Sequence, residues 1–273
     1  MTDRPDAAGA TPDDDAPDRS RPWVDPDGGP PIPIEEYRKR SRRSFLTFGV
    51  LGVGAYLGFR HLQNRPEDGS IPDFTRRALQ LNENVWERLQ RSSADSRTFS
   101  VDAREDIRVN GRIGLRDDLD QERWTVRVIG VDGHDLEALD ITDIQALGGV
   151  DAVWRHKCIE GWSNIVHWTG TRFSTFAERY AADQPEWDHV SLRTPDEEYY
   201  VGLDRYTMLH DQTLLAWGLN GEPLTPDHGA PLRLATSLKY GIKQLKRIGT
   251  IEFTNERPDD YWVERGYDFH AGF

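Results

Sequence analysis

The strongest chemical signal in the chain surrounds Cys158, the single cysteine among 273 residues. The thiol lies in the run WRHKCIEGW (154–162), where basic side chains precede it and an acidic one follows. Neighbouring cations favour the thiolate, which is the nucleophilic and metal-binding form of cysteine. A solitary cysteine can also be a small buried hydrophobe. An internal disulfide, a paired-cysteine redox site and a zinc knuckle are excluded, because each needs a second thiol.

A second signal is a basic cluster in an otherwise acidic chain. The segment HGAPLRL (228–234) is followed by LKYGIKQLKRIGTIEF (238–253). The second segment carries four basic side chains around a glycine: Lys239, Lys243, Lys246 and Arg247. Basic side chains and exposed backbone N–H groups bind phosphate through charge-assisted hydrogen bonds. The segment therefore suits a phosphate site, and a solvated basic loop is the alternative.

Other common catalytic motifs are absent from the sequence. No G-x-S-x-G elbow, H-E-x-x-H zinc pair or Walker-type phosphate loop occurs, and the glycines at 49, 52 and 54 lie inside an apolar run. We interpret His156 and His167 as ordinary polar or core histidines. Nucleotide-binding, serine-hydrolase and zinc-hydrolase activities are therefore not supported.

Several ordered motifs together resemble the molybdopterin-binding oxidoreductase domain of the sulfite oxidase family. They are CIEGW (158–162), WTG (168–170), LLAWGLNGEPLTPDHGAPLRL (214–234), KYGIKQLKRIGTIEF (239–253) and YWVERGY (261–267). Within that family the sequence is most similar to periplasmic methionine sulfoxide reductase catalytic subunits. The resemblance covers about residues 105–267. It implies a molybdopterin-dependent oxidoreductase with one molybdenum.

The resemblance also assigns roles to individual residues. Cys158 matches the cysteine whose thiolate ligates molybdenum, and a soft thiolate suits a metal that is already held by sulfur. Asn110, Thr194, His228 and Arg233 match residues that contact the cofactor. A backbone-plus-lysine clamp on the phosphate is matched by Gln244, Leu245 and Lys246, with Lys243 close by.

The chain departs from the family pattern beside the cysteine. Sulfite oxidases continue with arginines that help to bind the sulfite dianion, whereas this sequence continues IEGW (159–162). The resemblance therefore favours oxygen transfer to or from a sulfoxide or another neutral small molecule. Because the chain ends at Phe273, we expect the family's C-terminal immunoglobulin-like dimerisation domain to be missing and the protein to be a monomer. No haem motif occurs, which implies a separate membrane haem or quinone-linked electron-transfer protein.

The elements that must position these residues begin at Trp124. Strand-like runs separated by turn signals occur at 124–131, 189–194, 198–203, 213–219, 230–236 and 249–254. Helices are expected at about 141–147, 172–182 and 204–210. With no internal repeat and no regular βαβ alternation, the pattern predicts one mixed α+β domain over residues 105–273.

Residues 1–37 are acidic and rich in proline, so we expect them to be disordered. Arg42 and Arg43, followed by Phe45 and Leu46, resemble the twin-arginine export motif and imply the export machinery as a partner. The uncharged run from Phe45 to Phe59 spans about 22 Å as a helix, which is short of the ~30 Å hydrocarbon core. No A-x-A cleavage site follows it. We therefore expect residues 38–61 to be an uncleaved signal or membrane-anchor helix, with the catalytic domain periplasmic; an ordinary anchor beside a basic stop is the alternative.

Residues 62–104 are expected to form a polar tether and one helix. Apolar residues recur there at three- and four-residue spacing: Phe74, Ala78, Leu81, Val85 and Leu89. This spacing predicts an amphipathic helix that docks on the main domain through that face.

The net charge of −13 argues against a nucleic-acid partner. The leading hypothesis is a membrane-anchored, extracytoplasmic molybdenum oxidoreductase that performs two-electron oxygen-atom transfer. Two alternatives remain: a sulfite dehydrogenase-like enzyme, and a tethered binding domain without a cofactor. The presence of Cys158, Arg233 and Lys246 argues against the binding domain. The sequence leaves open the physiological substrate, the direction of catalysis, the electron partner and cleavage of the signal.

Overall fold

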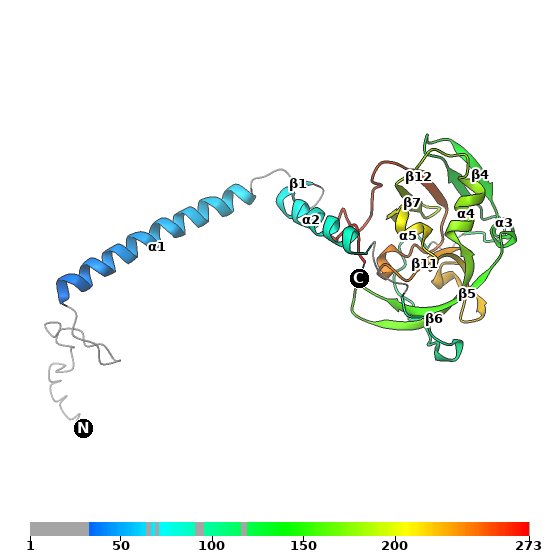
Figure 1. Cartoon of the computed structure of the whole chain (residues 1–273), viewed down its shortest axis with the longest axis horizontal. Coiled ribbons are helices and arrows are strands. Elements are labelled where there is room, and N and C mark those ends of the chain that lie inside the picture. Colours follow the sequence, from blue (N-terminus) through cyan, green and yellow to red (C-terminus); the bar gives the residue numbers. More distant parts are fainter. Residues whose placement is uncertain (1–32, 64–66, 69–70, 91–95, 116–118, 273) are drawn as a thin grey trace, which may run out of the picture. The chain divides into compact units, whose positions relative to one another are not determined.

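The computed structural model describes residues 33–63, 67–68, 71–90, 96–115 and 119–272. It divides the chain into two compact units, residues 1–64 and 65–273 (Figure 1). The acidic stretch lies outside the described residues as far as position 32.

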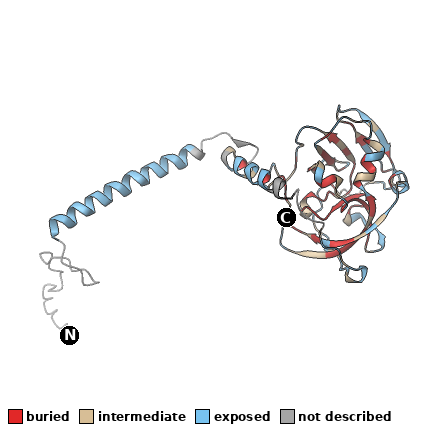
Figure 2. Cartoon of the chain, viewed as in Figure 1, coloured by how far each residue is buried: buried red, intermediate tan, exposed pale blue. Residues whose placement is uncertain are grey.

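The first unit contributes helix α1 (Ile34–Gln63). The helix starts before Tyr37, so residues 34–37 are helical and the expectation that they belong to a disordered tail was wrong. Glu35 and Glu36 lie in the first turn, where the helix dipole favours carboxylates. Its side chains are exposed over residues 34–61, which Figure 2 draws in pale blue. Among the described residues, no helix combines the length and apolar character that crossing a membrane requires.

Two five-stranded sheets build the second unit. In one, the strand order is β10-β9-β6-β5 and β11 also pairs with β9. Its strands are β5 (Val150–Lys157), β6 (Ser163–Arg172), β9 (Thr213–Leu219), β10 (Glu222–Pro223) and β11 (Arg233–Thr236). In the other, the order is β4-β3-β12-β7-β8. Its strands are β3 (Val126–Ile129), β4 (Asp135–Leu139), β7 (His189–Arg193), β8 (Tyr200–Asp204) and β12 (Thr250–Thr254). Because β12 runs parallel to β3 and antiparallel to β7, this sheet is mixed.

The helices predicted for the second unit are confirmed. They are α3 (Ile141–Ala146), α4 (Phe173–Tyr180) and α5 (Arg205–Leu209). The carboxylate of Asp140 accepts hydrogen bonds from the first backbone N–H groups of α3, and Asp204 does the same for α5. Together with the mixed sheet, these helices confirm the α+β class.

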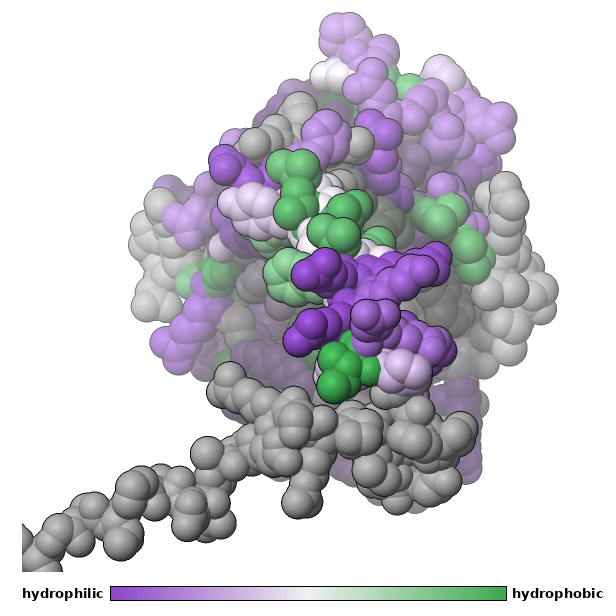
Figure 3. All heavy atoms as spheres, turned by 90° about the vertical axis from the view of Figure 1, so that its left-hand side faces the viewer, coloured by the Kyte–Doolittle hydropathy of each residue, from purple (hydrophilic) through white to green (hydrophobic). Residues whose placement is uncertain are grey.

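The core consists of two groups of buried apolar side chains. Buried residues are red along the ribbon in Figure 2. One group gathers around Phe173, Phe176 and Phe253, which come from α4 and β12. The other contains Trp154 and Trp168 on β5 and β6. Hydrophilic side chains predominate on the face that Figure 3 shows, as expected for a chain of this net charge.

The strand pattern did not predict β5 and β6, which pair with each other over the whole of β5 and over residues 163–170 of β6. The two strands carry the segment on either side of Cys158. Charged Arg155 and Lys157 alternate with buried Trp154 and His156, so β5 lacks the aliphatic alternation of a typical strand.

Helix α2 (Asp73–Gln90) packs within the second unit through Glu83, and the predicted docking face was wrong where its side chains are described. The side chains of Phe74 and Leu89, which belong to that predicted face, lie outside the part that the structure describes. Leu81 and Val85 of that face are 67% and 48% exposed. Glu83 is buried instead: its carboxylate accepts two hydrogen bonds from Arg257, at 2.9 and 3.0 Å, and one from the Phe269 backbone N–H at 2.9 Å. A bidentate ion pair therefore decides which side of the helix faces the domain. Short strands β1 (Glu67–Asp68) and β2 (Ile71–Pro72) precede α2, and a 3-10 turn, η1 (Val101–Ala103), follows it.

Candidate functional site

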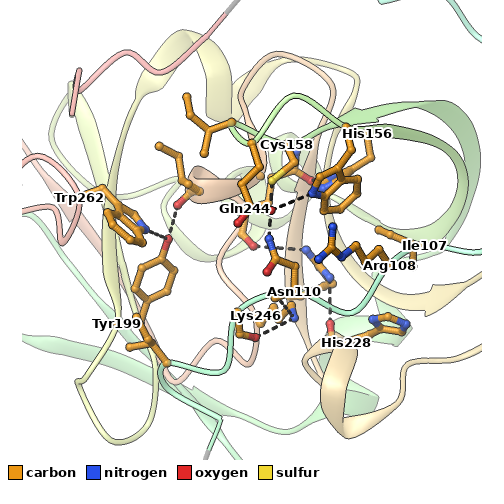
Figure 4. Close-up of a pocket in the computed structure, with 18 of the residues that line it drawn as sticks. Ile107, Arg108, Asn110, His156, Cys158, Tyr199, His228, Gln244, Lys246 and Trp262 are labelled. Atoms are coloured by element: carbon orange, nitrogen blue, oxygen red, sulfur yellow. Dashed lines mark hydrogen bonds between the residues drawn. The ribbon is translucent and has the colours of Figure 1, made fainter.

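A cavity in the second unit brings the thiol and the basic cluster together (Figure 4). Its walls come from the loop before β3, the end of β5, the β7–β8 turn, the start of β11, the turn after β12, and two 3-10 turns, η2 (Pro226–His228) and η3 (Gly241–Lys243). Six of the residues predicted to form the site line it: Asn110, Cys158, His228, Arg233, Gln244 and Lys246. These side chains are far apart in the sequence, so the fold assembles the site.

Cys158 lies in the tight turn that joins β5 to β6. Its backbone N–H donates to the Trp162 carbonyl at 2.9 Å, and its own carbonyl accepts from the Gly161 N–H at 3.0 Å. Gly161 has φ +91°, a left-handed conformation that glycine adopts without strain. The turn therefore holds the thiol at the end of a paired strand.

Asn110 connects the thiol with the basic wall. Its amide Nδ2 lies 3.7 Å from Cys158 Sγ, which is the geometry of a weak N–H to sulfur hydrogen bond. Its backbone carbonyl accepts from Lys246 Nζ at 2.6 Å, and Gly111 and Asp227 also provide carbonyl acceptors to this ammonium group. Lys246 thus holds the Asn110 loop against η2.

Arg233 supplies a buried positive charge at the start of β11. Arg233 is 3% exposed. Its guanidinium donates to the His228 carbonyl at 3.0 Å and the Gln244 carbonyl at 3.3 Å, and it stacks 4.8 Å from the Trp168 ring centroid. Burial lowers the pKa of Arg233 to about 10. Burial first, and Arg233 second, lower the pKa of Lys246 to about 7.

Among the described residues, Arg233 and Lys246 donate hydrogen bonds only to carbonyl oxygens and form no direct ion pair, although the nearby Asp227 carboxylate partly offsets the lowering of the Lys246 pKa. Two neighbouring cations with neutral partners favour an anionic occupant. A soft thiol on the same cavity suits a sulfur-ligated metal. The donor set consequently fits molybdopterin: Cys158 could hold the metal, and Arg233 and Lys246 could hold the phosphate.

His156 lines the cavity next to the clamp. Its Nδ1 lies 3.2 Å from Gln244 Oε1, and the amide Nε2 of Gln244 donates to the carbonyls of Thr236 and Lys239. Burial first, with Arg233 second, lowers the pKa of His156 to about 4, so the ring is neutral at pH 7. It is a buried, hydrogen-bonded histidine, as expected, and it also holds the Gln244 side chain.

Three predicted cofactor residues do not line this cavity. Thr194 donates to Asp196 Oδ1 at 2.6 Å and accepts from the Tyr199 N–H at 3.1 Å, so it shapes the β7–β8 turn. Lys243 is buried and donates to Asp260 Oδ2 at 2.5 Å. Leu245 is fully buried in the core.

Several lining residues were not predicted: Arg108, Glu160, Tyr199, Trp262 and Tyr267. Most of them stand within or beside motifs that carry the resemblance, such as CIEGW and YWVERGY, so motif membership was the usable signal. Tyr199 had no such signal, because only the β7–β8 turn brings it to the cavity.

Comparisons with known proteins show which family the sequence resembles. The family model described as an oxidoreductase molybdopterin binding domain matches residues 113–262. A putative protein-methionine-sulfoxide reductase subunit, YedZ1, of Azospira oryzae is 37% identical over 138 residues, covering 50% of this chain and 52% of the relative. The protein-methionine-sulfoxide reductase catalytic subunit MsrP of Xanthomonas axonopodis pv. citri is 33% identical over 153 residues, covering 51% of this chain and 47% of the relative.

The chain thus spans about half the length of these curated relatives. Among solved structures, the sulfane dehydrogenase SoxCD from Paracoccus pantotrophus is similar, with a TM-score of 0.46 and 14% identity over 51% of this chain and 40% of that one. The family match covers more than half of the chain and includes most of the residues that line the cavity. This chain therefore belongs to the sulfite oxidase family of oxidoreductases with a molybdopterin-binding domain.

Proposed function

We propose that the chain is the catalytic component of a molybdenum-dependent reductase that removes an oxygen atom from a neutral sulfoxide. The reaction converts the sulfoxide, two electrons and two protons into a thioether and water. The bound cofactor supplies the two-electron oxygen-atom transfer. The chain itself binds the cofactor, holds the substrate and excludes competing anions.

The observation that carries this proposal is the position of Glu160 in the cavity wall, two residues after Cys158. Hydrogen bonds from the Trp162 indole first, and from Asn110 next, lower the pKa of the Glu160 carboxyl. Trp162 Nε1 lies 3.0 Å from Glu160 Oε2. The carboxylate is therefore charged at neutral pH and repels a sulfite dianion, whereas a sulfoxide carries no net charge. The names of the Azospira and Xanthomonas relatives point to the same substrate class.

In this proposal Cys158 is the metal ligand, and Asn110 lies beside it. Arg233 and Lys246 hold the phosphate by charge. His228 and Gln244 line the cavity around the pterin. Thr194, Lys243 and Leu245 act on the site through the residues they support.

A separate protein would deliver the electrons. The single cysteine cannot form a C-x-x-C-H haem attachment, so covalent haem of that type has no place in this sequence. A membrane haem or quinone-linked protein is the partner class we propose, with the catalytic unit outside the cytoplasm. Arg42 and Arg43, followed by the apolar run at 45–59, support export through the twin-arginine route.

The test compares substrates with the molybdenum-loaded full chain and a reduced viologen dye as the electron donor. We expect reduction of dimethyl sulfoxide and methionine sulfoxide, and no comparable oxidation of sulfite with a dye acceptor. The matched variant Glu160→Gln keeps the size of the side chain and removes its charge, so sulfite should become a stronger competitive inhibitor. Sulfite oxidation faster than sulfoxide reduction would instead assign the chain to the sulfite dehydrogenase-like alternative.

A further inference from the structure

The cavity has an aromatic side that the basic wall does not explain. Tyr199 and Trp262 lie together on one side in Figure 4, and Arg108 and His228 lie on the other, with Cys158 between them. Tyr267 also lines the cavity, and its ring centroid is 5.1 Å from that of Trp262. The cofactor phosphate needs cations, which the aromatic side does not provide. The aromatic side is therefore available for a different ligand.

A hydrogen bond to Tyr199, which is itself held by Ile242, fixes the edge of the Trp262 indole. Trp262 Nε1–H donates to the Tyr199 hydroxyl at 2.9 Å, and that hydroxyl donates to the Ile242 carbonyl at 2.5 Å. Burial first, and the nearby Asp260 carboxylate second, raise the pKa of Tyr199 well above its ordinary value, so the hydroxyl keeps its proton at any physiological pH. Tyr199 is therefore a positioning residue for the indole and not an acid for the reaction.

The backbone of Trp262 is held as well. Asp260 Oδ1 accepts hydrogen bonds from the N–H groups of Trp262 and Val263, at 3.0 and 3.1 Å. The other oxygen of Asp260 accepts from buried Lys243. Ile242 and Lys243 both belong to η3, so one 3-10 turn anchors the side chain and the backbone of Trp262.

An aromatic surface held this firmly suits one kind of ligand. Thioether sulfur and alkyl or aryl groups bind to aromatic rings by dispersion and by contacts between sulfur and the ring. A fixed ring also loses little conformational entropy when a ligand packs against it. The Cys158 thiol thus lies between the anion-binding side of the cavity and its rigid apolar side.

We propose that Trp262, positioned by Tyr199, is the specificity-determining residue that receives the larger apolar substituent of the sulfoxide. This inference rests on the proposed function and deepens it. It predicts that the enzyme distinguishes sulfoxides by the size of the group that packs on Trp262. A methyl group gains little from the ring, and a phenyl group gains much more.

The test uses the molybdenum-loaded full chain with two substrates, dimethyl sulfoxide and methyl phenyl sulfoxide. We expect Trp262→Ala to raise KM for methyl phenyl sulfoxide about tenfold and KM for dimethyl sulfoxide less than about threefold. Calorimetric binding of methyl phenyl sulfone gives a readout without turnover, and its Kd should rise by about the same factor. The molybdenum content of each variant shows that the site is still loaded. Tyr206→Ala, at a half-exposed aromatic on α5 outside the cavity wall, is the matched control.

A double-mutant cycle tests the positioning role of Tyr199. Tyr199→Phe should raise the sulfone Kd in the wild-type background and have no effect in a Trp262→Phe background, which lacks the indole N–H. An equal effect of Tyr199→Phe in both backgrounds would overturn the positioning role.

The outcomes separate this inference from the proposed function. If the wild type reduces both sulfoxides and Trp262→Ala leaves the ratio of their KM values unchanged, only the role of Trp262 fails. If the wild type reduces neither sulfoxide and still binds the sulfone in a Trp262-dependent way, only the proposed function fails. A wild type that neither reduces a sulfoxide nor binds the sulfone would overturn both.

Discussion

Lys246 Nζ donates to the backbone carbonyl of Asn110 at 2.6 Å, although the two residues are 136 positions apart. This contact joins the basic clamp to the loop that brings an amide to Cys158. Burial and Arg233 lower the pKa of Lys246 to about 7, so its charge changes near neutral pH. Sulfate keeps the same charge in this range and can replace the phosphate as a probe. Its affinity for the cofactor-free chain should fall as the pH rises through about 7, and Lys246→Met should remove that pH dependence.

The lowered pKa of Lys246 also predicts how the free energy of unfolding depends on pH. Its pKa is near 10.4 in the unfolded chain and about 7 in the folded one, so between these values the unfolded state binds more protons. The contribution of Lys246 to the free energy of unfolding should therefore rise with pH across this window. Denaturant titrations of the wild type and Lys246→Met at several pH values measure the difference. A slope that is identical in the two proteins would contradict the lowered pKa.

The buried pair of Lys243 and Asp260 predicts a large loss of stability when one partner is removed. Asp260→Asn leaves a buried ammonium without its counterion, and we expect the free energy of unfolding to fall by about 3–5 kcal/mol. The double variant Lys243→Met with Asp260→Asn should lose less than the sum of the two single variants. Urea unfolding followed by circular dichroism measures all four proteins, and strict additivity would show that the two groups do not interact.

The ion pair between Glu83 and Arg257 predicts how α2 is held. Glu83→Gln should cost about 2 kcal/mol and increase hydrogen exchange throughout α2, because the carboxylate is buried and accepts three hydrogen bonds. Leu81→Ser is the matched control on the exposed face and should change stability by less than about 0.5 kcal/mol. If Leu81→Ser were the more damaging change, the apolar face would be the docking face after all.

Export through the twin-arginine route predicts a sharp dependence on two side chains. Changing Arg42 and Arg43 together to lysine preserves the charge, and the protein should nevertheless remain in the cytoplasm of the producing host. Cell fractionation with antibody detection of the chain measures the distribution. Unchanged export of the double-lysine variant would contradict the twin-arginine assignment.

The sequence could predict those site residues that stand in a motif with a chemical meaning, and it could not predict those whose role depends on contacts between distant segments. Cys158, Arg233 and Lys246 stand in motifs with a chemical meaning of their own, and the fold brings them to one cavity. Lys243 stands in the same basic motif as Lys246. Only the tertiary structure shows that the charge of Lys243 is paired with that of Asp260. Helix periodicity identified α2, but periodicity does not reveal that Arg257 and Glu83 form a bidentate pair across the fold. Tyr199 stands in the strand run predicted at 198–203, but a strand pattern does not show that its side chain reaches the cavity.

The most direct test of the central claim is the ratio of molybdenum and pterin to protein in the full chain, produced in a host that makes the cofactor. We predict about one molybdenum and one pterin per chain, consistent with a cavity that has one thiol. The variant Cys158→Ala should retain its circular dichroism spectrum and lose both turnover and the thiolate-to-metal absorption. Folded wild-type protein that contains neither molybdenum nor pterin would contradict the account and favour a tethered binding domain.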